Sequence, residues 1–321
     1  MRFLTRCAAM AGLALLAVTA QAQTFPSKAV RIVVPFGAGG VADLTARTVA
    51  EKLSQSLGQA VVIDNKPGAG GVAAGDFVAK AAPDGHTLLL ISNGTAVSAG
   101  LFKSLPFDTV RDFAPISTLA TFDIAVITAA ESPFKTLGEL LAFAKANPGK
   151  LNLGTINIGS TQNLTGELLK SAAGIDVQIV PFNGTPAVIT ALRGKQIDAA
   201  VEILGPVIPH INSKTVRALA VTGTKRSAVL PEVPTAVEGG VPGLVASSWN
   251  GLAAPAKTPA AVIARLNKDI AAAVDAPDVR ANLRALNMEA QSSTPAQAAE
   301  LLASETKRWG DVIVRAKIPT Q

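Results

Sequence analysis

The chain has 321 residues, a formal net charge of +6 at pH 7, and 49% hydrophobic, 16% charged and 4% aromatic residues. This apolar content suffices for a large core, and a single cysteine excludes a disulfide within the chain. The lysines and arginines form no run and aromatic residues are scarce, which disfavours nucleic-acid binding. The mild positive charge instead suits attraction of a small anion.

The first 22 residues have the pattern of a secretory signal peptide. Arg2 and Arg6 form a basic region, residues 10–19 are apolar, and Ala20-Gln21-Ala22 supplies the small residues before a cleavage site. The apolar run is shorter than the roughly 20 residues that span a membrane. We therefore expect cleavage after Ala22 and export of a soluble protein to the periplasm. Cys7 lies inside this segment and lacks the small residues that precede a lipidated cysteine.

A glycine-rich turn joins a predicted strand at 29–34 to a predicted helix at 41–57. The turn consists of Phe36, Gly37, Ala38, Gly39 and Gly40. A turn at a helix start leaves the N–H groups of Ala38 to Gly40 free, with the positive end of the helix dipole behind them. We predict that the turn binds a carboxylate or phosphate, with Phe36 as an apolar wall. The alternative is a tight turn that binds nothing.

Strand and helix signals then alternate along the chain. We predict strands at 60–63, 87–91, 113–120, 123–128, 151–155, 177–181, 197–201 and 216–222, and helices at 71–82, 136–147, 163–173, 186–193 and 205–213. After a Pro- and Gly-rich return linker at 230–244 we predict a strand at 247–253 and helices at 259–276, 278–287 and 295–316. Near-continuous apolar strands such as 87–91 are typical of a parallel sheet covered on both faces.

This order of elements predicts an α/β protein with two doubly wound lobes. We expect lobe 1 to comprise residues 23–124 and 248–321, and lobe 2 to comprise residues 125–247. The chain would then cross between the lobes twice. Ligands of open α/β sheets bind beyond the carboxyl ends of the strands, which predicts a site between the lobes.

The second lobe contains a turn that mirrors the first. Gly159, Ser160 and Thr161 open a helix after a strand and offer hydroxyl and backbone donors to a second anionic group. The alternative for the hydroxyls is helix capping. Four further candidates follow or flank strands: Thr95, Asn183, Gly184 and Asp198. The Asp198 carboxylate would either accept a hydrogen bond from the ligand or be satisfied by backbone N–H groups.

Several motifs occur in a fixed order along the chain. They are Pro-Phe-Gly-Ala-Gly-Gly at 35–40, Asn-Lys-Pro-Gly-Ala-Gly-Gly at 65–71, Pro-Asp-Gly-His-Thr-Leu-Leu at 83–89, Leu-Pro-Phe-Asp at 105–108, Arg-Asp-Phe at 111–113, Val-Pro-Phe-Asn-Gly-Thr-Pro-Ala at 180–187 and Gly-Lys-Gln-Ile-Asp at 194–198. Together they resemble the Bug or TctC-like extracytoplasmic receptors of the tripartite tricarboxylate transporters. The resemblance covers essentially the whole chain after the signal peptide.

The resemblance implies a periplasmic-binding-protein fold, in which two lobes close around a ligand cleft as in a type II Venus flytrap. It implies a small organic carboxylate as ligand (a di- or tricarboxylate, an amino acid or an aromatic acid) and delivery to a membrane permease. No metal, organic cofactor or catalysis is implied, and we expect a monomer. At positions where the family often has His or Tyr, this chain has His86, Phe107, Asn163 and Phe182, and it contains no tyrosine.

Two other functions were weighed against this one. An adaptor that signals to a membrane sensor kinase would have the same binding lobes, so the sequence leaves it open. A Rossmann-type nucleotide-dependent enzyme would need G-x-G-x-x-G, whereas Gly37-x-Gly39-Gly40 is followed by Asp43, which does not fit that spacing. Asp43 and Arg47, four residues apart, favour a structural ion pair. His86 and His210 have no partner at metal-ligand spacing.

Overall fold

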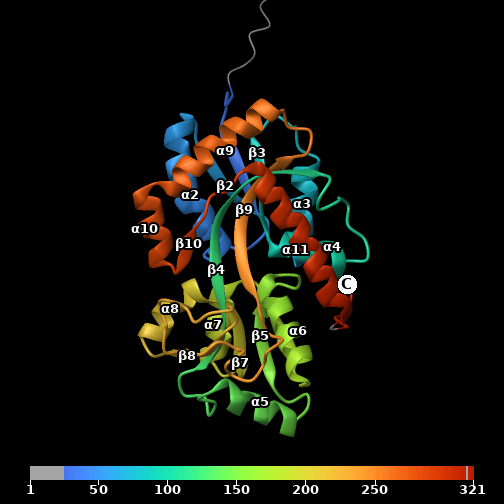
Figure 1. Ribbon diagram of the computed structural model, residues 1–321, viewed down its shortest axis with the longest axis vertical. Coiled ribbons are helices and arrows are strands. Elements are labelled where there is room, and N and C mark those ends of the chain that lie inside the picture. Colours follow the sequence, from blue (N-terminus) through green and yellow to red (C-terminus); the bar gives the residue numbers. More distant parts are fainter. Residues whose placement is uncertain (1–24, 316) are drawn as a thin grey trace, which may run out of the picture.

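The computed structural model describes residues 25–315 and 317–321, so the predicted signal peptide lies outside the described residues. Figure 1 shows two lobes, one above the other, connected by the long strands β4 and β9. Each lobe has strands at its centre and helices around them, which confirms the predicted two-lobed α/β fold.

The first lobe, uppermost in Figure 1, contains β1 (Val30–Val34), α2 (Val41–Leu57), β2 (Val61–Asn65), a 3-10 turn (Ala69–Gly71), α3 (Val72–Ala79), β3 (Thr87–Ser92), α4 (Asn93–Leu101), β9 (Ser247–Pro255), α9 (Ala260–Asp275), α10 (Pro277–Ala285), β10 (Met288–Ala290) and α11 (Pro295–Arg315). The second lobe contains α5 (Leu137–Ala146), β5 (Asn152–Ile156), α6 (Thr161–Ala173), β6 (Gln178–Phe182), α7 (Thr185–Arg193), β7 (Ala199–Ile203), α8 (Leu204–Asn212) and β8 (Val216–Val221). β4 (Phe113–Ala129) runs through both lobes.

Helix α2 shows how the sequence sets these elements. Apolar and small residues recur every three or four positions, and Val49, Leu53 and Leu57 of this stripe are buried in the core. Gly40 precedes the helix in an extended conformation, and Gly58 ends it with a φ of 66°, which glycine adopts without strain. The helix therefore has the predicted bounds.

One mixed sheet runs through both lobes in the order β2-β1-β3-β9-β4-β7-β5-β6, and β8 and β10 pair with β4. In the first lobe β1 lies between β2 and β3 as a parallel partner of both. In the second lobe β5 lies between β6 and β7 in the same way. The two parallel triplets are therefore equivalent, and the helices α2 and α6 follow their central strands.

The prediction of two strands at 113–120 and 123–128 is wrong, because β4 is continuous over 17 residues. The residues between the two predicted strands also pair with β9, and they keep the backbone extended. β4 pairs with β9 as far as Asp123 and with β7 from Ile124. The strand therefore changes partners at this point, where it passes from one lobe to the other.

The sequence analysis also missed a helix and a strand. Helix α4 begins at Asn93, where no element was predicted, because Ser92 and Thr95 cap it reciprocally. The N–H of Gly94 donates to Ser92 Oγ and the N–H of Ser92 donates to Thr95 Oγ1, both at 3.1 Å. Strand β10 has only three residues and pairs antiparallel with β4.

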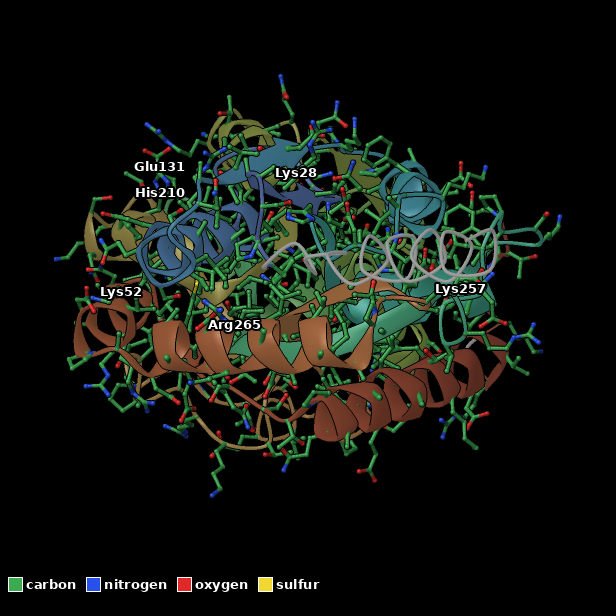
Figure 2. The ribbon with its side chains drawn as sticks, turned by 90° about the horizontal axis from the view of Figure 1, so that it is seen from above. Lys28, Lys52, Glu131, His210, Lys257 and Arg265 are labelled. Carbon is green, nitrogen blue, oxygen red and sulfur yellow. The ribbon has the colours of Figure 1, made fainter. Side chains whose placement is uncertain are left out.

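The core and the surface are clearly separated. Trp309 on α11 is fully buried, and its Nε1–H donates to Glu305 Oε2 at 3.0 Å. Charged side chains such as Lys28 and Lys257 are exposed at the surface (Figure 2). No helix within residues 25–315 and 317–321 is both long and apolar enough to cross a membrane.

Candidate functional site

A cleft lies between the lobes, where the strands of the two parallel triplets end. First-lobe elements contribute Phe36, Gly37, Gly40, Val41, Ala42, Ser92, Ser248 and Asn250 to its lining, and second-lobe elements contribute Ile156, Asn157, Thr161, Gln162, Gly184, Thr185 and Ile203. The cavity has a volume of about 30 Å³, room for no more than one or two water molecules. A ligand of several carbon atoms therefore needs the lobes to move apart.

The first glycine loop, residues 36–40, presents the start of α2 to this cleft. Gly39 has a φ of +79°, and its N–H donates to Asp43 Oδ2 at 3.0 Å. Within the described part of the chain, the neighbouring N–H groups without an acceptor include those of Ala38, Gly40, Val41 and Ala42. These donors and the helix dipole suit an anion.

The second glycine loop, residues 157–160, has the same geometry at the start of α6. Gly159 has a φ of +80°, and its N–H donates to Asn163 Oδ1 at 3.2 Å. Asn163 is therefore the counterpart of Asp43, because each is the third residue of its helix and lies four residues after a positive-φ glycine. The two lobes thus present equivalent helix starts to one cleft.

An ion pair behind the first glycine loop holds it in place. Arg47 Nη2 lies 3.0 Å from Asp43 Oδ1 and 3.2 Å from Asn65 Oδ1, and Asn65 Nδ2 donates to the carbonyl of Phe36 at 3.0 Å. Burial alone would raise the pKa of Asp43, but hydrogen bonds from Arg47, the Gly39 N–H and Asn65 outweigh it and lower that pKa. The ionised Asp43 is therefore paired within the scaffold, as its spacing from Arg47 predicts.

Buried polar atoms without a partner gather at the cleft. Asn157 Oδ1 and Asn250 Nδ2 have none within the described residues, although both side chains line the cleft. Nearly all buried polar groups in folded proteins are hydrogen-bonded. The two asparagines come from opposite lobes and can offer an acceptor and a donor to a bound molecule.

Glu202 lies on β7 behind the second-lobe wall of the cleft and is fully buried. Its Oε2 accepts a hydrogen bond from Thr185 Oγ1 at 3.0 Å, and its Oε1 has no partner in the described chain. Burial raises the pKa of Glu202 to about 7, against the opposing effect of its polar neighbours Thr185, Gln162 and the Ile203 N–H. A carboxyl with such a pKa beside a cleft is a functional candidate.

The structure brings most of the predicted site residues together. Five of them line the cleft: Phe36, Gly37, Gly40, Thr161 and Gly184. Five others belong to the same loops without lining the cavity: Ala38, Gly39, Gly159, Ser160 and Asn183. Thr161 Oγ1 lies 3.2 Å from Ser248 Oγ, so this predicted residue also joins the two lobes.

Two predicted residues lie away from the cleft. Thr95 is buried in the first turn of α4, and its hydroxyl oxygen is taken up by the capping box. Asp198 precedes β7, and its Oδ2 accepts the N–H of Asn152, the first residue of β5, at 2.8 Å. This is the amino end of the parallel strands, whereas the cleft is at their carboxyl end. Backbone satisfaction, the second role foreseen for Asp198, is the one observed.

The Ser160 hydroxyl also has the partners of a helix cap. Its Oγ accepts the N–H of Asn163 at 3.1 Å and lies 3.5 Å from the carbonyl of Ile156, and the residue is 1% exposed. Capping was the alternative role for this side chain, and the geometry favours it over a ligand contact by the hydroxyl.

Sequence reasoning did not single out six residues of the site: Asn157, Gln162, Thr185, Glu202, Ser248 and Asn250. Part of the signal was present. Ser248 and Asn250 are two residues apart in a predicted strand and so share one face. Glu202 is the only charged residue of β7, whose other four residues are apolar. Only the pairing of the strands places these residues beside the glycine loops.

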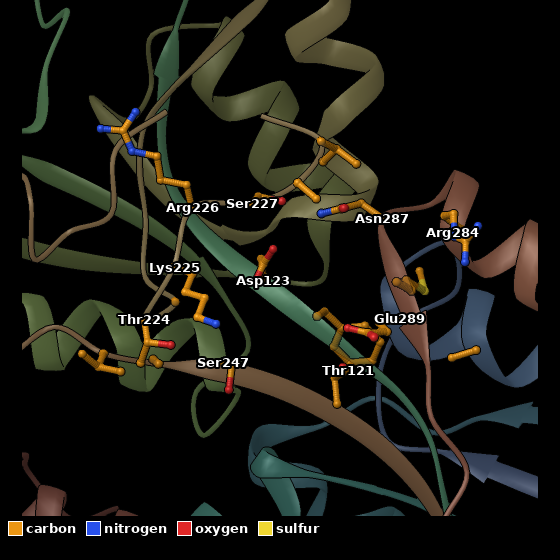
Figure 3. A pocket seen from close by; sticks show the side chains of 18 of the residues that line it. Thr121, Asp123, Thr224, Lys225, Arg226, Ser227, Ser247, Arg284, Asn287 and Glu289 are labelled. Carbon is orange, nitrogen blue, oxygen red and sulfur yellow. The ribbon is translucent and has the colours of Figure 1, made fainter. Parts of the chain in front are cut away.

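A second, larger cavity of about 900 Å³ lies behind the crossing strands β4 and β9 (Figure 3). Ser247 and Asp123 face this cavity, whereas Ser248 faces the cleft. Three arginines that line it pair with acidic side chains: Arg226 with Glu238, Arg280 with Asp275 and Arg308 with Glu305. Much of its positive charge is thereby neutralised, so the glycine-loop cleft is the better candidate for an anion.

Among the described residues, no group of three or more His, Cys, Asp or Glu side chains could hold a metal ion. His86 is buried beside the predicted turn at 83–85, and its Nε2 accepts the N–H of Ser27 at 3.1 Å. This histidine therefore has a structural partner.

The sequence matches a family described as the tripartite tricarboxylate transporter family receptor over residues 45–318. Since the match spans most of the chain, the protein belongs to this family. The resemblance inferred from the motifs is confirmed.

Three solved structures are similar to this one. MatC from Rhodopseudomonas palustris, with bound malate, is 34% identical in sequence and has a TM-score of 0.85. The match covers 90% of this chain and 100% of the MatC chain. Rpa4515 from R. palustris, with adipate, is 30% identical with a TM-score of 0.88, covering 92% and 100%. The periplasmic binding protein BugD is 31% identical with a TM-score of 0.88, covering 92% and 100%.

Burial of Glu202 predicts a stability that depends on pH. The pKa of about 7 in the folded chain exceeds the ordinary value of 4.5, so the stabilising proton is lost as the pH rises. The free energy of unfolding should therefore decrease between about pH 4.5 and 7, by about 3 kcal/mol in total. Glu202→Gln, which stays neutral, should lack this decrease and gain stability relative to wild type at pH 8.

Urea denaturation of both proteins at pH 5 and pH 8 checks this expectation. Glu300→Gln, at an exposed position of α11, serves as the matched control and should follow the wild type. Equal pH dependence in wild type and Glu202→Gln would show that Glu202 does not hold an extra proton in the folded state.

Proposed function

We propose that this protein is an extracytoplasmic solute-binding receptor that captures a small organic carboxylate between its lobes. The observation that carries the proposal is that cleft-lining residues at both helix starts have N–H groups without an acceptor in the described chain, Gly40, Val41 and Ala42 in one lobe and Thr161 and Gln162 in the other. Malate in MatC and adipate in Rpa4515 support a carboxylate as the ligand class.

Each loop would hold one end of the ligand. In the first loop the N–H groups of Gly40 and Val41 donate to a carboxylate, and Asn250 Nδ2 adds a side-chain donor. Charge-assisted hydrogen bonds of this kind contribute roughly 1.5–3 kcal/mol each. A ligand with a polar group at each end would bind most tightly, because closure satisfies both ends at once.

The lobes would open by bending of β4 and β9. We place the boundaries near residues 124 and 247, supported by the change of β4 partners after Asp123. Within the described residues, the hydrogen bonds between the lobes include one from the Gly70 N–H to the Ile158 carbonyl at 2.8 Å, one between Thr161 and Ser248, and one from Arg308 Nη2 to the Val245 carbonyl at 3.0 Å. Such polar contacts cost little to break, which suits hinge motion.

The receptor would act in the periplasm and deliver its ligand to a membrane permease of the tripartite tricarboxylate type. The signal-peptide pattern that ends at Ala22 and the family support this placement. The closed pair of lobes would then be the form that the permease recognises.

A thermal-shift screen of residues 23–321 tests the function. The protein is unfolded, washed and refolded to remove bound ligand, then heated with malate, succinate, adipate, glutamate and benzoate. A binder at a hundredfold excess over its Kd should stabilise the fold by about 2.7 kcal/mol. Phosphate, ATP and NAD are the controls, and a shift with a nucleotide alone would favour an enzyme over a receptor.

The first glycine loop can be tested with a matched pair of variants. Gly39→Ala and Gly58→Ala both place a side chain at positive φ, 79° and 66°, so each should lose about 1–2 kcal/mol of stability. Only Gly39 belongs to a loop of the cleft, and its Cβ would face Pro186 and shift the N–H donors; Gly58 is in open space.

We expect Gly39→Ala to weaken the tightest-binding carboxylate of the screen at least tenfold, and Gly58→Ala to bind it like the wild type. Isothermal titration calorimetry measures both affinities. Equal affinity in the two variants would remove the first glycine loop from the site.

A further inference from the structure

We propose that Glu202 and Thr185 form a hydrogen-bond-accepting subsite that selects carboxylates carrying a donor substituent, either a hydroxyl or an ammonium group. This inference rests on the carboxylate receptor proposed above and names the class of ligand more closely. It follows from the hydrogen-bonding capacity of the second-lobe wall.

The Thr185 hydroxyl has a single proton to donate. A threonine hydroxyl can donate once and accept twice. Thr185 lines the cleft, but its proton is directed at Glu202 Oε2, 3.0 Å away and fully buried. While Glu202 is ionised, the hydroxyl oxygen can therefore only accept from a molecule in the cleft.

A second side chain on the same wall of the cleft, that of Asn157, can also accept a hydrogen bond. Asn157 lines the cleft from the second glycine loop, and its Oδ1 is buried without a partner in the described chain. The two acceptors lie on the same lobe, whereas the unpaired donor Asn250 Nδ2 and the first glycine loop lie on the other. A hydroxyl or ammonium on the ligand would satisfy the second-lobe acceptors.

The charge of Glu202 also contributes to this subsite. No cationic side chain is among the groups that set the pKa of Glu202, and its Oε1 has no partner in the described residues. When ionised, the carboxylate therefore gives the wall behind Thr185 a negative potential. This potential favours a donor and disfavours a carboxylate at that point, while the helix starts of both loops remain open to carboxylates.

The test uses three matched series of acids that differ in one substituent: succinate, malate and aspartate; glutarate, 2-hydroxyglutarate and glutamate; adipate, 2-hydroxyadipate and 2-aminoadipate. Isothermal titration calorimetry with the ligand-free chain should give at least tenfold tighter binding of a hydroxy or amino acid than of its unsubstituted parent. Which of the two is preferred distinguishes a hydroxyl from an ammonium.

Variants assign the preference to these residues. Thr185→Val removes the acceptor, and Glu202→Gln allows the amide to donate to Thr185 and frees the hydroxyl proton toward the cleft. Both should reduce the ratio of the two affinities, that of the substituted acid over that of its unsubstituted parent, at least fivefold. Thr185→Ser, which keeps the hydroxyl, should retain the preference. Thermal unfolding confirms that each variant is folded.

The outcomes separate this inference from the function on which it rests. Binding of substituted and unsubstituted acids with equal affinity, or variants that leave the ratio unchanged, would overturn the subsite while the receptor stands. Binding confined to acids without a donor substituent would also overturn it. If no carboxylate binds at all, the proposed function itself fails.

Discussion

The site depends on one backbone interaction that occurs twice. A glycine at positive φ lies in the loop after the central strand of each triplet. Its N–H donates to the side chain of the third residue of the next helix, Asp43 or Asn163. After this bond, the first two N–H groups of each helix have no acceptor within the described chain, those of Val41 and Ala42 in α2 and those of Thr161 and Gln162 in α6. A residue with a Cβ would strain the turn. Gly39 and Gly159 therefore allow the turns that bring both helix starts to the cleft.

The strands that connect the lobes also carry part of the site. Alternation along β9 directs Ser248 and Asn250 to the cleft and Ser247 to the cavity behind it. A ligand that binds Asn250 would therefore contact one of the two strands that connect the lobes.

The sequence predicts where helices and strands lie along the chain better than it predicts which of them lie side by side in the fold. Local signals, such as the stripe and flanking glycines of α2, suffice for helix bounds, and the glycine loops follow from a turn at a helix start. The continuity of β4 depends on its pairing with β9, a strand far along the chain. The start of α4 depends on a reciprocal cap whose sequence is also typical of a turn. Glu202 and Asn250 enter the site only through strand pairing, whereas Asp198 leaves it because it precedes its strand.

The two glycine loops reach the same geometry with different charges, and this difference has an electrostatic reason. Asp43 is ionised, and Arg47 neutralises it outside the cleft. Asn163 performs the same role as a neutral amide, and its Nδ2 donates to Thr155 at 3.3 Å. Neither loop therefore opposes the helix dipole with an unpaired negative charge. The unpaired acid of the site is Glu202, set behind Thr185 and away from the helix starts. One small cleft can thus contain both helix starts that attract a carboxylate and, at Thr185, an acceptor that selects ligands with a hydrogen-bond donor.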